Sequence, residues 1–152
     1  MVTVDLAEVT RQAAESAKLE AQQRDIRIDL EVPDGFKLEA DRAEMEMVFN
    51  NLVSNAVKYN REHGRVRVTA SETGDAIRIQ VEDTGIGMTP EETKRLFNDF
   101  SRIKNEKTRH ILGSGLGLST VKKLVTLYGG EIAVKSKPDV GSTFTVTLKR
   151  KS

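Results

Sequence analysis

The stretch GSGLGLSTVKKLVTLYGG, residues 113–130, places three glycines at alternate positions directly before an apolar, helix-forming segment. Glycine loses more chain entropy on folding than any other residue, so such a run needs a reason. Consecutive N–H groups without Cβ atoms at the start of a helix suit an oxyanion, because no side chain blocks its approach. A helix entry built from small residues for packing explains the pattern as well. The nucleotide signatures G-x-x-x-x-G-K-[ST] and G-x-G-x-x-G are both absent.

The composition limits the possible functions of the chain. Its 152 residues, 38% hydrophobic and 31% charged, fit one soluble globular domain over residues 1–152. Lys and Arg number 24 against 23 Asp and Glu, so no overall field attracts nucleic acid or an anionic membrane. The absence of cysteine and the presence of only two histidines exclude disulfides and thiolate or multi-histidine metal sites. No signal peptide and no apolar run of about 18 residues occurs, and we expect a cytoplasmic domain.

The spacing of apolar and turn residues predicts an order of helices and strands. Helical periodicity predicts helices over residues 3–24, 41–60, 90–97 and 117–128. Alternation predicts strands over residues 26–32, 36–40, 65–71, 76–83, 131–136 and 142–149. Asp41 is a good N-cap, and Gly129 and Gly130 end the last helix. The predicted fold class is α+β: a two-layer α/β sandwich whose mixed, mostly antiparallel sheet is covered on one face by three helices.

The segment EDTGIGM, residues 82–88, ends one of these strands with an acid and two glycines. Strand alternation turns Asp83 toward the interior, and a buried carboxylate needs hydrogen-bond donors, such as the exocyclic amine of adenine. Gly85 and Gly87 would let a ligand lie flat against the main chain. The alternative is that Asp83 caps a turn toward Gly85, and the sequence leaves both open.

The segment NLVSNAVKY, residues 51–59, places two amides and an ammonium on one helix face. Asn51, Asn55 and Lys58 stand at i, i+4 and i+7, so they lie over about two turns of that face. An amide oxygen can ligate Mg²⁺, which takes phosphate oxygens and water as its other ligands. The face is a candidate shelf for magnesium and phosphate, and a solvated helix surface is the alternative. The basic segment 102–110 likewise suits a solvated loop or a cationic cover for a polyphosphate.

The order of the motifs is more specific than any one of them. NLVSNAVKY, DTGIG, RLFNDFSR, GSGLGLSTVKKLVTLYGG and GSTFTVTL follow one another over residues 51–148. In that order they resemble the N, G1, F and G2 boxes of the catalytic ATP-binding domain of sensor histidine kinases, within the superfamily of gyrase, heat-shock chaperone and histidine kinase ATPases. The resemblance implies a Bergerat-type fold that binds ATP and Mg²⁺ between helices and sheet under a flexible lid. It also implies transfer of the γ-phosphoryl group to a histidine in two-component signal transduction.

The resemblance assigns metal and phosphate roles to the helix face. Asn55 matches the Mg²⁺ ligand, Asn51 a group that supports the metal and phosphates, and Lys58 the phosphate-contacting lysine. Arg102 matches a lid residue near the γ-phosphate, which makes these four the candidate catalytic residues. Asparagine at position 51 stands where gyrase-like ATPases have a glutamate that activates water, so hydrolysis should be slow.

The resemblance also assigns residues to the base, the lid and the triphosphate. Tyr59 matches the residue that lines the nucleotide, and Asp83 the acid that holds the adenine amine, above a turn at Gly85 and Gly87. Phe97 and Phe100 match aromatic residues that anchor the start of the lid. The lid hinge and triphosphate cradle correspond to Gly113, Ser114, Gly115, Leu116, Gly117 and Leu118. The chain departs from the family at Tyr128, where histidine is frequent, and at Ser114, where threonine is common.

The expected partner is a histidine-bearing dimerisation hairpin, because no phospho-acceptor motif of the HELRTP type occurs. His63 and His110 lie in predicted loops, and we interpret both as surface residues. The hairpin would belong to a longer parent chain or to another protein, with a response regulator as the indirect partner. We expect a monomeric domain without nucleic-acid or membrane contact. Two alternatives share the motifs: a stand-alone serine kinase of the anti-sigma-factor type, and a non-catalytic docking module that depends on nucleotide.

Overall fold

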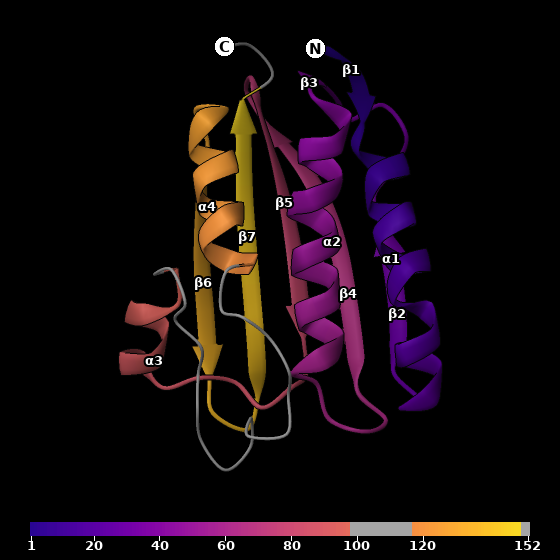
Figure 1. Ribbon diagram of the computed structural model, residues 1–152, viewed down its shortest axis with the longest axis vertical. Helices are drawn as coiled ribbons and strands as arrows, with labels where there is room; N and C mark the ends of the chain where they lie inside the picture. Colours follow the sequence, from indigo (N-terminus) through magenta and orange to yellow (C-terminus); the bar gives the residue numbers. More distant parts are fainter. Residues whose placement is uncertain (98–116, 150–152) are drawn as a thin grey trace.

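The chain folds into helices and strands that form two layers (Figure 1). The computed structural model describes residues 1–97 and 117–149. In chain order the elements are β1 (Val2–Asp5), α1 (Leu6–Gln23), β2 (Arg27–Glu31), β3 (Lys37–Ala40), α2 (Arg42–Lys58), β4 (Arg65–Thr73), β5 (Ala76–Asp83), α3 (Pro90–Arg95), α4 (Gly117–Leu127), β6 (Glu131–Lys137) and β7 (Gly141–Lys149).

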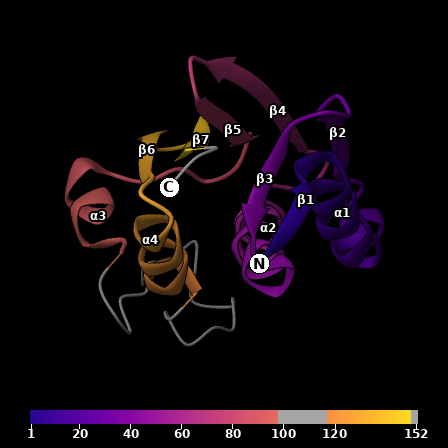
Figure 2. The ribbon, with the colours of Figure 1, turned by 90° about the horizontal axis from the view of Figure 1, so that it is seen from above.

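The main sheet has the strand order β2-β4-β5-β7-β6. β2 runs parallel to β4, and every other neighbouring pair in this sheet is antiparallel. Figure 2 shows α1, α2 and α4 on one side of the sheet, with the short α3 beside its β6 edge. The predicted class, a two-layer sandwich with a mixed, mostly antiparallel sheet under three helices, is therefore confirmed.

The hydrophobic core lies between the helices and the sheet. α2 contributes a stripe of fully buried side chains, among them Phe49 and Leu52, and strand residues such as Val68 and Ile79 meet them from the sheet. Burial alternates along β5, as expected for strands with one covered face. No helix within residues 1–97 and 117–149 is long and apolar enough to cross a membrane.

The start of α1 differs from the sequence prediction. Helical spacing predicted a helix from residue 3, but residues 2–5 form β1, which pairs antiparallel with β3 in a separate two-stranded sheet. Asp5 is the N-cap, and its Oδ1 accepts a hydrogen bond from the Ala7 N–H at 2.9 Å. The partner of β1 lies more than 30 residues further along the chain, so local periodicity does not reveal it.

The other helix boundaries agree with the local signals to within two residues. Asp41 is the N-cap of α2, as predicted, and accepts from the Glu44 N–H at 3.1 Å. α2 ends at Lys58 rather than at residue 60. α3 begins with a capping box formed by Thr89 and Glu92 around Pro90.

Candidate functional site

Three of the predicted motifs meet at one end of the sandwich, toward the lower half of Figure 1. The C-terminal half of α2, the end of β5 and the first turn of α4 converge there. A methyl group at Gly117 would lie 2.6 Å from the Oδ1 of Asn51, which shows how closely α4 approaches α2. The Ile86 N–H donates to the Tyr59 carbonyl at 3.0 Å and joins the segment after β5 to the end of α2. The fold therefore assembles residues that lie far apart in the sequence.

Asp83 is buried at the end of β5, with 8% of its surface exposed. Its Oδ1 accepts hydrogen bonds from the main-chain N–H of Gly85 at 2.9 Å and of Ser142 at 3.3 Å. Both of its hydrogen bonds within the described residues go to Oδ1, which leaves Oδ2 available to another donor. Burial raises the pKa of this carboxyl to about 6, against the two main-chain bonds that lower it. The predicted inward orientation is confirmed, and the bond to Gly85 shows that Asp83 also caps the turn.

The glycines after Asp83 are required by the protein's own packing. A methyl group at Gly85 would lie 2.2 Å from the Tyr59 carbonyl oxygen. Gly87 has φ +67°, and a methyl group there would lie 1.9 Å from the Lys137 carbonyl oxygen. Both neighbours are main chain and cannot rotate away. The sequence suggested bare main chain for a ligand, and the structure adds close contact between three backbone segments.

The polar face of α2 forms as predicted. Asn51, Asn55 and Lys58 are all partly exposed. The Asn51 Nδ2 donates to the Met47 carbonyl at 2.8 Å, which turns Oδ1 toward Gly117. Within the described residues, the side chains of Asn55 and Lys58 make no hydrogen bond or ion pair, so no group in this part of the chain occupies the amide oxygen or the ammonium. This donor set fits magnesium and phosphate.

The start of α4 carries the remaining candidate residues that the structure describes. Gly117 and Leu118 open the helix, and both are half-buried. Phe97 packs against the core, and the Lys122 Nζ lies 5.7 Å from the centre of its ring. Seven of the residues named above lie outside the described residues: Phe100, Arg102, His110, Gly113, Ser114, Gly115 and Leu116.

Several residues around the site carry contacts that the sequence motifs did not single out. The buried Asn60 donates through Nδ2 to the Arg65 carbonyl at 3.1 Å and accepts from the Arg61 N–H at 2.9 Å. The Arg24 guanidinium donates to the carbonyls of Val57 at 2.6 Å and Lys58 at 3.0 Å, at the end of α2. Arginine and asparagine after a helix are common at surfaces, so their sequence positions alone gave no signal.

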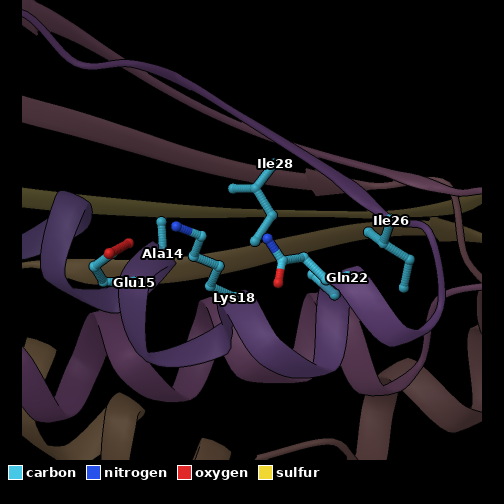
Figure 3. Close-up of a pocket in the computed structure, with 7 residues that line it drawn as sticks. Ala14, Glu15, Lys18, Gln22, Ile26 and Ile28 are labelled. Atoms are coloured by element: carbon cyan, nitrogen blue, oxygen red, sulfur yellow. The ribbon is translucent and has the colours of Figure 1, made fainter.

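A hollow of about 240 Å³ lies elsewhere, between α1 and β2 at the far edge of the sheet (Figure 3). Its lining residues are Ala14, Glu15, Lys18, Ala21, Gln22, Ile26 and Ile28. None of them belongs to the motifs, and the hollow is smaller than the roughly 300–1,000 Å³ typical of ligand pockets. The candidate site is therefore the convergence of α2, β5 and α4.

Comparison with known proteins supports one family. Residues 40–152 match the family model described as histidine kinase-, DNA gyrase B- and HSP90-like ATPase. The sensor-like histidine kinase SenX3 of Mycobacterium tuberculosis is 36% identical over 148 residues, which cover 97% of this chain and 36% of SenX3. The alginate biosynthesis sensor protein KinB of Pseudomonas aeruginosa is 33% identical over 149 residues, which cover 97% of this chain and 24% of KinB. The chain thus spans about a third or less of the length of these relatives.

Solved structures agree with the sequence relatives. The mycobacterial sensor histidine kinase MprB superposes with a TM-score of 0.84 at 26% identity, over 98% of each chain. Full-length ShkA, solved in complex with AMPPNP, superposes with a TM-score of 0.80 at 28% identity, over 99% of this chain and 31% of ShkA. By its motifs, its fold and these matches, the chain belongs to the family of histidine kinase-, DNA gyrase B- and HSP90-like ATPases, as a catalytic ATP-binding domain of the sensor histidine kinase type.

Proposed function

We propose that this domain binds Mg-ATP and transfers the γ-phosphoryl group to a histidine on a separate dimerisation and phospho-acceptor domain, from which a response regulator would then receive it. The observation that carries the proposal is the buried Asp83 carboxylate, because its Oδ2 has no hydrogen-bond donor within the described residues and can accept one from a ligand. Membership of an ATPase family supports adenine as that ligand's base.

Asp83 would recognise the base through the exocyclic amine of adenine. The N–H groups of Gly85 and Ser142 hold Oδ1, so the carboxyl group has a fixed plane and Oδ2 a fixed direction. An amine donates to this oxygen, whereas the carbonyl that guanine and hypoxanthine carry in its place does not. Tyr59, which is half-buried at the end of α2, would line the same pocket, and Gly85 and Gly87 would lie beneath the base.

Asn55 would hold Mg²⁺ with support from Asn51, and Lys58 would contact phosphate. When bound, Mg²⁺ would neutralise negative charge on the β- and γ-phosphates during transfer. The Asn51 Nδ2 is bonded to the Met47 carbonyl, so Oδ1 is the atom that it offers to the site. ShkA, which is 28% identical to this chain, was solved in complex with AMPPNP, and this supports a nucleotide as the ligand. From the sequence we propose Arg102 and residues 113–118 as the lid contacts to the triphosphate.

The acceptor imidazole would be the nucleophile, so this chain's task is to position ATP and stabilise charge. Asn51 cannot act as a general base, and hydrolysis by water should therefore be slow. His63 is an exposed residue whose Nδ1 lies 2.7 Å from Asp25 Oδ2, and it remains assigned to the surface. The domain would act in the cytoplasm as part of a sensor.

Two measurements test the proposal. Calorimetric titration with ATP, ADP and GTP, with and without Mg²⁺, should show binding that is selective for adenine and strengthened by Mg²⁺ for ATP. Mixing the domain with a histidine-bearing hairpin and labelled ATP should give a phosphoprotein that acid hydrolyses and alkali does not. An acid-stable phosphoprotein would favour the serine kinase instead. Binding without transfer to any acceptor would favour the docking module.

A further inference from the structure

The Arg61 side chain joins two loops near Asp83 by donating hydrogen bonds to their main-chain carbonyls. It lies three residues after the end of α2. Its Nε donates to the Thr84 carbonyl at 2.6 Å, and its Nη2 donates to the Gly85 carbonyl at 3.2 Å and the Asp139 carbonyl at 2.5 Å. A guanidinium presents its donors in a rigid planar fork, so three acceptors on one group fix their relative positions.

The two loops that Arg61 links are the ones that hold Asp83. Thr84 and Gly85 follow Asp83 directly, and the Gly85 N–H is one of its two donors. Asp139 belongs to the turn between β6 and β7, and the other donor, the Ser142 N–H, follows that turn. Arg61 therefore connects the two sources of the hydrogen bonds on Asp83 Oδ1.

The loops lie in close contact, so a small displacement changes the direction of the carboxylate. A methyl group at Gly141 would lie 2.0 Å from the Asp83 carbonyl oxygen, and one at Gly87 would lie 1.9 Å from the Lys137 carbonyl oxygen. The Asp139 N–H also donates to the Ile86 carbonyl at 2.7 Å. Besides this main-chain bond and the two bonds that Asp83 Oδ1 accepts, the Arg61 guanidinium also joins the two loops.

We propose that Arg61 is a positioning residue for adenine recognition: by joining the Thr84–Gly85 segment to the β6–β7 turn, it aims Asp83 Oδ2 at the amine of the base. This inference rests on the proposed function, since it takes adenine as the ligand of Asp83. Arg61 has no contact with the nucleotide in this proposal. Its effect on binding passes through the geometry of the carboxylate alone.

The test compares ATP with inosine triphosphate, which carries a carbonyl in place of the adenine amine and an N1–H donor in place of the N1 acceptor. The ratio of the two affinities measures recognition of this edge of the base, which is the edge that Asp83 Oδ2 would contact. The wild-type domain should prefer ATP, and Arg61→Ala should lower this preference about ten-fold by weakening ATP binding, the scale of one misplaced polar contact. Arg61→Lys, which keeps the charge and reaches one carbonyl at a time, should give an intermediate ratio.

The control is Arg67→Ala, because Arg67 is also an exposed arginine but lies within β4 and pairs with Glu31 of β2. The ratio of ATP affinity to inosine triphosphate affinity in this variant should equal that of the wild type. A purely structural role for Arg61 would lower the melting temperature or weaken both nucleotides equally, and either result without a change in the ratio overturns the inference. If Arg61→Ala does not fold, Arg61→Lys decides by the same ratio.

The experiment separates this inference from the function on which it rests. A wild-type domain that binds ATP and inosine triphosphate equally would overturn the adenine site and the role of Arg61 with it. A wild-type preference that persists in the Arg61 variants would overturn the role of Arg61 alone. In the background of Asp83→Asn, Arg61→Ala should have no further effect on the ratio, because the group that it positions has been changed.

Discussion

Replacement of Asp83 by asparagine should raise the stability of the domain and abolish its preference for adenine. In the folded protein, burial raises the pKa of Asp83 to about 6 from a usual value of 3.8. The folded state therefore binds more protons at this position than the unfolded state between about pH 4 and pH 6. Stability falls as the pH rises through this window and stays at the lower level above about pH 7, where Asp83 is ionised in both states.

The size of the effect follows from the two pKa values. The difference between about 6 and 3.8 is about two pKa units, and each unit is worth about 1.4 kcal/mol. The ionised carboxylate thus costs the unliganded domain about 3 kcal/mol at neutral pH. Asparagine removes the charge and keeps an oxygen for the Gly85 and Ser142 N–H groups, but it buries an NH₂ group in exchange. We expect Asp83→Asn to be more stable by about 1–3 kcal/mol at pH 7.5.

The assay is denaturant unfolding of the wild type and the variant at several pH values, from about pH 4.5 to pH 7.5. The difference in unfolding free energy should grow with pH and level off above about pH 7. Asp75→Asn, at an exposed turn residue between β4 and β5, is the control and should show no such growth. Calorimetry on the same samples should show that Asp83→Asn has lost selective ATP binding.

Two results would refute the reasoning. A stability difference that is the same at every pH would show that ionisation of Asp83 does not destabilise the folded state. An Asp83→Asn variant that keeps the wild-type ATP affinity would remove Asp83 from adenine recognition. For the wild type itself, ATP affinity should fall between pH 7.5 and pH 5, because the neutral acid is the poorer acceptor.

Three further substitutions test other parts of the site. Asn55→Ala should weaken Mg-ATP far more than metal-free ADP in calorimetry, and equal losses would remove Asn55 from the metal site. Gly87→Ala should lower the unfolding free energy by more than about 2 kcal/mol, because a methyl group there would lie 1.9 Å from a main-chain oxygen at φ +67°. Gly74→Ala, with φ +61° and open space around it, is the matched control and should cost only about 1 kcal/mol. Tyr128→Phe removes a hydroxyl that donates to the Glu44 Oε1 at 2.6 Å, and it should lower the unfolding free energy by about 1–2 kcal/mol; an unchanged denaturation midpoint would contradict this.

The sequence predicted well the features that depend only on neighbouring residues. Asp41 was recognised as an N-cap because a carboxylate at that place satisfies free N–H groups, and this needs no information from the rest of the chain. The inward orientation of Asp83 followed from alternation along one strand in the same way. The face shared by Asn51, Asn55 and Lys58 followed from helical geometry.

What the sequence did not reveal depends on contacts between distant segments. β1 exists because residues 2–5 pair with residues 37–40, and its valines taken alone fit the first turn of a helix. Arg61 carried no signal in the sequence, because its three acceptors are main-chain carbonyls, which any sequence would supply. Gly85 and Gly87 were predicted to make room for a ligand, but they first make room for the carbonyls of Tyr59 and Lys137.

The contact between Gly117 and Asn51 bears on why glycine stands at the start of α4. Gly117 is helical, so its backbone conformation does not require glycine, but a methyl group there would lie 2.6 Å from the Asn51 Oδ1. That oxygen cannot turn away without breaking the bond from Nδ2 to the Met47 carbonyl. At the other end of α4, the Tyr128 hydroxyl accepts from the Asp41 N–H at 2.9 Å and fixes the helix to the start of α2.

α4 is therefore held against α2 at both of its ends. Its first turn begins beside Asn51, which lies about one helical turn before Asn55 on the polar face of α2. The two explanations that the glycine stretch first allowed, close packing and oxyanion binding, are then compatible at Gly117. If α2 holds the phosphates as we propose, packing of Gly117 against Asn51 would place the start of α4 next to them.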